Sequence, residues 1–132
     1  MMLTQEADNR PAIIDLPAAP PLVGGDPAID TAHLALITHG EPETEREMLR
    51  VFDLQADLLL ARMSSEEPKA AAAYAHTLAV SARSLGAFKV AQAAAAIEQI
   101  TSQPGPVVLT SAMTRLSRAV IDVQDAIASR LG

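Results

Sequence analysis

The sequence predicts an all-α protein, an antiparallel up-down-up-down four-helix bundle with a short extra helix and a proline-rich tail at its N-terminus. Three observations favour this fold class. The 132 residues are 49% hydrophobic but include only two Phe, one Tyr and no Trp, so the core must be built from aliphatic side chains and alanine, which suits helices better than strands. Apolar residues recur every three or four positions. Helix start and stop signals divide the chain into helical segments. A chain of this length fits one domain.

Residues 1–28 differ from the rest, because they hold five of the nine prolines and a pair of glycines. Proline removes backbone donors and glycine adds chain entropy. We therefore expect a flexible tail, although Ile13, Ile14, Leu16 and Leu22 leave open that part of it docks in a groove. Residues 29–132 are expected to form the helical domain.

The first two helices are expected over residues 30–38 and from Pro42 onward. Asp30 or Thr31 is a suitable N-cap for the first, which should end near Gly40. Proline is tolerated in a first helical turn, so it is expected to open the second helix. The second helix carries a buried stripe at the spacing of three and four residues, and further apolar residues widen it, so the helix should contact more than one neighbour. The stripe comprises Met48, Leu49, Phe52, Ala56, Leu59 and Met63, and the widening residues are Val51, Leu54 and Leu58.

Three further helices are expected in the second half of the chain. Ser64 or Ser65, followed by Glu67 and Pro68, is typical of a helix start, and this third helix should end at Gly86. A fourth helix is expected over residues 87–100, before a break at residues 102–106. The last helix has the clearest periodicity, with apolar residues at Leu109, Met113, Leu116, Val120, Val123, Ile127 and Leu131.

Charge and composition exclude several function classes. The net charge of −6, with no run of basic residues, argues against binding to nucleic acid or to an anionic membrane. The absence of cysteine excludes disulfides, thiolate catalysis and cysteine zinc sites. The sequence shows neither a signal-peptide pattern nor a run of about 20 apolar residues. We expect a cytoplasmic protein.

His76 is the main candidate for chemistry. Steps of 100° per residue place Ala71, Tyr74, Leu78, Ala82 and Leu85 on the opposite side of the third helix, so His76 should point to solvent. Its outer-face neighbours are small and apolar where a solvated face normally carries charge, which suggests a partner; an ordinary exposed histidine is the alternative. These neighbours are Ala72, Ala73, Ala79 and Val80, with Lys69 and Arg83 one heptad before and after the histidine.

Other catalytic or metal sites have little support. His33 and His39 lack a paired acid at ligand spacing, so no metal site is expected. Ser81 and Ser84 have no base at a suggestive spacing, and the chain contains no glycine-rich phosphate loop. We therefore expect no nucleotide site and no cofactor bound by this chain.

The stretch from His76 to Ala87 resembles the signature of histidine-containing phosphotransfer (HPt) domains of bacterial two-component phosphorelays, approximately H-x-L-K-G-S-[SA]-x-x-L-G-A. Ala79 and Val80 depart from it, standing where the family has lysine and glycine. The resemblance implies that His76 is a phosphoacceptor between receiver-domain aspartates and that the protein is a phosphohistidine carrier, not an enzyme with its own kinase activity. The matching positions are His76, Leu78, Ser81, Ala82, Leu85, Gly86 and Ala87.

The resemblance also implies partners and further site residues. The partners would be receiver domains of response regulators and of a hybrid histidine kinase, with Mg²⁺ on the receiver, and the carrier would be a monomer. Arg83 or Lys69 could contact phosphate in place of the missing lysine. Glu98 would orient the imidazole through its other ring nitrogen. Ala72, Ala73, Ala79 and Val80 would lie on the surface that contacts the partner.

Two alternatives stay open. Ala79 and Val80 allow a degenerate module of this type that binds receivers without phosphotransfer. The wide apolar stripe on residues 48–63 allows a dimeric helical scaffold unrelated to signalling.

Overall fold

The computed structural model of the chain describes residues 27–65, 68–100 and 105–131, and the regular elements within these ranges are all α-helices, as predicted. The expected flexible tail over residues 1–28 lies outside the described residues, except for residues 27 and 28. No described helix combines the length and the hydrophobicity that a membrane span requires. The helices are α1 (Thr31–Ile37), α2 (Pro42–Ser65), α3 (Pro68–Leu85), α4 (Phe88–Glu98) and α5 (Pro106–Leu131).

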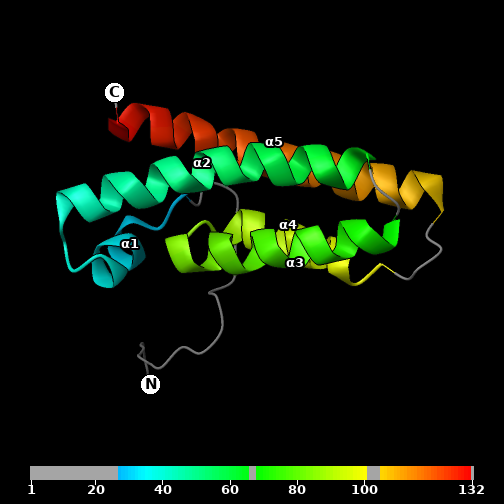
Figure 1. Cartoon of the computed structure of the whole chain (residues 1–132), viewed down its shortest axis with the longest axis horizontal. Helices are drawn as coiled ribbons and strands as arrows, with labels where there is room; N and C mark the ends of the chain where they lie inside the picture. Colours follow the sequence, from blue (N-terminus) through cyan, green and yellow to red (C-terminus); the bar gives the residue numbers. More distant parts are fainter. Residues whose placement is uncertain (1–26, 66–67, 101–104, 132) are drawn as a thin grey trace, which may run out of the picture.

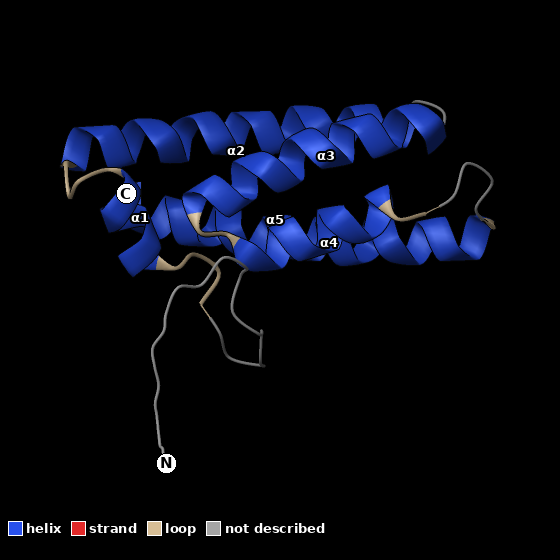
Figure 2. Ribbon diagram, turned by 90° about the horizontal axis from the view of Figure 1, so that it is seen from below, coloured by secondary structure: helices blue, strands red, loops and turns tan. Residues whose placement is uncertain are grey.

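The four longer helices lie side by side. Helix α2 contacts α3 and α5, and α4 contacts the same two helices, so each packs against two neighbours (Figure 1). The short α1 packs against α3 at one end of this arrangement (Figure 2). The expectation that α2 touches more than one neighbour is confirmed.

The core is aliphatic, as the composition predicts. Every predicted stripe residue of α2 is buried except Met48, which is half-buried. However, Val51, Leu54 and Leu58 are 53%, 73% and 54% exposed, so they do not pack against a neighbouring helix as expected. The residues of the buried stripe already face α3 and α5. These three side chains therefore lie on the outer surface. The large side chains that are fully buried are Leu34, Leu49, Leu78, Leu85, Leu116, Ile127, Val90, Val120 and Val123.

Alanine sets the spacing of α3 and α4. Small side chains on facing helices let their backbones approach closely, and the facing surfaces of both helices are rich in them. This close approach positions the last turn of α4 beside the middle of α3. The buried alanines are Ala71, Ala75, Ala79 and Ala82 of α3, and Ala91, Ala93 and Ala94 of α4, with Ala87 between the helices.

A glycine ends α3 as predicted. Gly86 has a φ of +93°, and its amide hydrogen-bonds to the carbonyl of Arg83 at 3.3 Å while that of Ala87 bonds to Ala82 at 2.8 Å. This is the Schellman arrangement, in which a residue with positive φ satisfies the last helical carbonyls. The carbonyl of Gly86 accepts from the Asp30 amide at 2.9 Å. The turn therefore also fixes the position of α1.

Helix α1 has defined ends. The Asp30 side chain accepts from the His33 amide at 3.0 Å, which confirms Asp30 as the N-cap. At the other end, His39 has a φ of +54° and precedes Gly40 at +70°. The third helix starts later than its cap signal suggests, because α2 continues to Ser65 and the Ser64 hydroxyl donates to the Leu60 carbonyl at 3.1 Å. Ser64 therefore does not act as the cap of α3.

Candidate functional site

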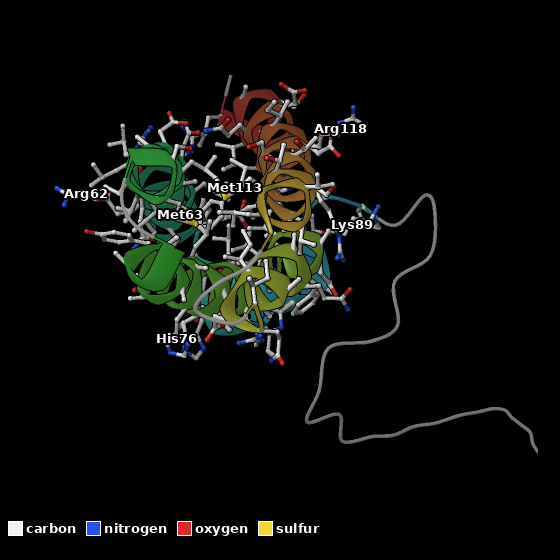
Figure 3. All side chains as sticks on the ribbon, turned by 90° about the vertical axis from the view of Figure 1, so that its right-hand side faces the viewer. Arg62, Met63, His76, Lys89, Met113 and Arg118 are labelled. Carbon is white, nitrogen blue, oxygen red and sulfur yellow. The ribbon has the colours of Figure 1, made fainter. Side chains whose placement is uncertain are left out.

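His76 lies in the middle of α3 and points away from the core. Its side chain is 64% exposed, and Figure 3 shows it on the outside of the helices, whereas Met63 and Met113 point inward between them. The residues expected on the opposite side of α3 are buried, apart from Tyr74, which is half-buried. The predicted orientation of the imidazole is therefore correct.

Glu98 approaches the imidazole from the neighbouring helix. It is the last residue of α4, and its Oε2 atom lies 2.7 Å from His76 Nδ1. Because a carboxylate accepts hydrogen bonds, this contact favours the tautomer of the neutral imidazole that carries its proton on Nδ1 and its lone pair on Nε2. The Glu98 side chain is 30% exposed, so it is more buried than that of the histidine. The result is an oriented imidazole that presents one nitrogen to solvent.

The small residues around His76 separate into two groups. Ala73 is exposed, Ala72 is half-buried, and Val80 is 47% exposed one turn after the histidine. In contrast, Ala79 is only 1% exposed. The expectation that Ala79 lies on the outer face is wrong, because α4 approaches α3 closely on that side and covers it. Its side chain cannot contact phosphate or a partner directly.

The two expected cations differ in what the structure describes. Arg83 is exposed and lies two turns after His76 on α3. Together with Ile37 and Val80 it lines a shallow hollow between α1 and α3. The side chain of Lys69 lies outside the described part of the chain, although its backbone belongs to α3.

His33 has a structural role that the sequence did not indicate. Its Nε2 atom lies 3.2 Å from the Ser84 carbonyl, and its ring meets the edge of Phe88 with centroids 5.3 Å apart. The first contact holds α1 against the end of α3, and the second holds it against the first residue of α4. The contact with Ser84 joins residues 51 positions apart, so no local pattern could have revealed it.

A larger hollow of about 630 Å³ lies between α2 and α3. Val51 and Phe52 of α2 and Val80 of α3 contribute apolar surface, and Glu43 and Glu47 lie at the α2 side. Periodicity could have located the exposed Val51, because it lies more than 100° from the centre of the buried stripe.

A comparison with known protein families assigns the chain to a family. The family model for the Hpt domain matches residues 46–127, more than half of the chain. The chain belongs to the Hpt domain family. No curated protein and no solved structure matched the chain significantly. Hpt domains are phosphocarrier modules rather than kinases, and they interact with receiver domains in phosphorelays.

The matched part of this Hpt domain contains both His76 and Glu98, whereas α1 precedes it. In the described residues, no three His, Asp or Glu side chains come together as a metal site would require. Among the described residues, His76 is an exposed imidazole in contact with a carboxylate, that of Glu98.

Proposed function

We propose that this Hpt domain is a cytoplasmic phosphorelay intermediate of a bacterial two-component pathway. His76 accepts a phosphoryl group from the receiver domain of a hybrid histidine kinase and passes it to a response regulator. The observation that supports this role most directly is the exposed imidazole whose Nδ1 atom lies 2.7 Å from Glu98 Oε2.

The proposed transfer uses the two ring nitrogens differently. The lone pair of His76 Nε2 attacks the phosphorus of the receiver's aspartyl phosphate, the bond between phosphorus and the carboxylate oxygen breaks, and its electron pair returns to the aspartate. The proton stays on Nδ1, where Glu98 accepts its hydrogen bond and offsets the positive charge that develops on the ring. The same steps in reverse transfer the group to the second receiver. The receiver supplies Mg²⁺, so this chain contributes a positioned nucleophile.

Arg83 is the described cation that could reach the phosphoryl group from α3. It lies about 10 Å from His76 along the helix axis, so an extended side chain would be needed. Its exposure permits that reach. We propose Arg83 as the phosphate contact that compensates for an alanine at position 79, with Lys69 as a second cation on the same helix face.

The proposal includes the architecture that presents the site. Residues 29–132 would form an antiparallel up-down-up-down four-helix bundle that works as a monomer, preceded by a flexible tail. The receiver would dock over Ala73 and the edge of Ala72, and the exposed apolar residues of α2 would complete the contact. A rigid helix face of this kind holds the nucleophile in a fixed position while the partner supplies the reacting group.

The proposal is tested by phosphotransfer profiling. The chain is incubated with a panel of purified receivers that carry radioactive phosphate, and then with unlabelled receivers. We expect label that is acid-labile and base-stable, that is absent from His76→Gln and that moves on to a second receiver. The control is His39→Asn, because His39 is an exposed histidine away from α3 and asparagine tolerates its positive φ. Equal labelling of His76→Gln and wild type would exclude the proposed role.

One alternative is favoured by a specific observation. Ala79 is buried and uncharged, so no cation stands directly beside His76 at that position. A module that binds receivers without accepting phosphate is consistent with this feature. Receiver binding without any label on His76 would establish it. The exposed Val51, Leu54 and Leu58 also suit a dimeric scaffold, which light scattering would reveal as a stable dimer.

A further inference from the structure

Val80 separates two hollows beside His76. It lies one helical turn, about 6 Å along the axis, from the histidine, and its side chain is 47% exposed. On one side is the hollow between α2 and α3, of about 630 Å³. On the other side is the hollow between α1 and α3, of about 490 Å³. Val80 and Ser84 line both, so they form a ridge between the two.

The ridge presents an apolar surface because the hydroxyl of Ser84 already donates a hydrogen bond within α3. Ser84 Oγ donates to the Val80 carbonyl at 3.1 Å, and the Ser84 carbonyl lies 3.2 Å from His33 Nε2. The methyl groups of Val80 are therefore the main feature that a partner would meet. An exposed apolar ridge between two hollows favours a partner surface with apolar side chains on both sides of it.

The two hollows carry opposite charges. Glu43 and Glu47 line the α2 side of the first, without any Lys or Arg among its lining residues. Arg83 lines the second, with His33 beside it and no acidic residue in the lining. The charge thus changes sign across Val80. Complementary charges fix the orientation and accelerate encounter more than they raise affinity.

We infer that Val80 and this charge reversal select which receiver domains dock and in which orientation. The partner is a receiver domain that places one apolar side chain in each hollow, with a basic group toward Glu43 and Glu47 and an acidic group toward Arg83. This inference rests on the proposed function, and it adds a rule for choosing among receivers. Helix α1 takes part because it forms one wall of the second hollow.

A charge exchange tests the orientation. The double variant Glu47→Arg with Arg83→Glu keeps the net charge of the chain. It exchanges the positive and negative sides of the ridge. We expect the receiver that binds wild type best to bind the double variant at least ten-fold more weakly, with a smaller difference at high salt. The control exchange, Arg118→Glu with Asp122→Arg, also keeps the net charge. Arg118 lies on a different side of the molecule from His76 (Figure 3), so this control should bind as wild type does.

A shortened side chain tests the ridge. Val80→Ala removes the two methyl groups without breaking the helix. We expect the best receiver to bind about five-fold more weakly, and the affinities of the receivers in the panel to differ less from one another. The control is Val108→Ala, an exposed valine in the first turns of α5. Circular dichroism checks that every variant remains folded.

Binding and transfer are measured separately, so that two failures can be distinguished. If receivers bind but never label His76, the proposed function is wrong, and the binding data still judge the inference. If receivers label wild type but the double variant and Val80→Ala keep wild-type affinities across the panel, the inference alone is wrong. If no receiver binds wild type, both are wrong.

Discussion

Replacement of Gly86 by alanine should destabilise the domain far more than the same change at Gly40. Both glycines have positive φ, +93° and +70°, which costs an L-residue about 1–2 kcal/mol. Only at Gly86 is the space occupied, because an added Cβ would lie 2.9 Å from the Asp30 carbonyl oxygen, whereas nothing lies within 4 Å of one at Gly40.

The magnitude follows from what the clash disrupts. Asp30 must move, which breaks the 2.9 Å hydrogen bond from its amide to the Gly86 carbonyl, worth about 0.5–1.5 kcal/mol. With the backbone cost, we expect Gly86→Ala to lower the free energy of unfolding by about 2–3 kcal/mol, against about 1 kcal/mol for Gly40→Ala. The lower entropy of the unfolded chain affects both variants alike.

Urea denaturation followed by circular dichroism measures the difference. With a slope of about 1–2 kcal/mol per molar urea, the midpoint of Gly86→Ala should fall by about 1–3 M and that of Gly40→Ala by about half as much or less. Displacement of α1 should also weaken the binding of receivers that use the hollow between α1 and α3. If Gly86→Ala proves no less stable than Gly40→Ala, the contact between Asp30 and the turn does not hold α1 as described.

Three further predictions concern the site. Glu98→Ala should slow labelling of His76 about five-fold in single-turnover transfer, because Nδ1 loses its hydrogen-bond acceptor. Glu98→Gln should retain most of the rate, because its amide oxygen can still accept this bond. Equal rates for the two variants would show that Glu98 does not orient the imidazole. Arg83→Ala should slow transfer about two- to five-fold, with a smaller effect at high salt, and an unchanged rate would mean that Arg83 does not contact the phosphoryl group. Ala79→Leu should lower the free energy of unfolding by about 1–3 kcal/mol through overpacking, whereas Ala73→Leu on the exposed face should change it by less than about 0.5 kcal/mol; similar urea midpoints for the two would contradict the burial of Ala79.

The helices and the direction of His76 could be predicted because both depend on local patterns. An aspartate such as Asp30 can accept a hydrogen bond from the free backbone amides at the start of any helix. A glycine such as Gly86 adopts a positive φ that other residues avoid. The angle of His76 relative to the buried Leu78 follows from helix geometry alone. Such features need no knowledge of which helices are neighbours.

The remaining features depend on distances between helices, which local patterns do not specify. Ala79 lies only 60° from His76 around α3, yet it is covered, because the alanines of both helices let α4 approach. Leu54 and Leu58 look like core residues by type, but α2 already buries another stripe. The contact between His33 and Ser84 forms only when α1 folds back onto α3.

The proposed phosphotransfer requires His76 to accept phosphate at Nε2 while Nδ1 stays bonded to Glu98. The most direct measurement is a two-dimensional ¹H–¹⁵N spectrum of the chain with ¹⁵N-labelled histidines, recorded after phosphorylation by a receiver. We expect one modified ring, that of His76, with the phosphoryl group on Nε2 and a proton on Nδ1. A phosphoryl group on Nδ1, or on His33 or His39 in place of His76, would contradict the proposed role of His76 Nε2.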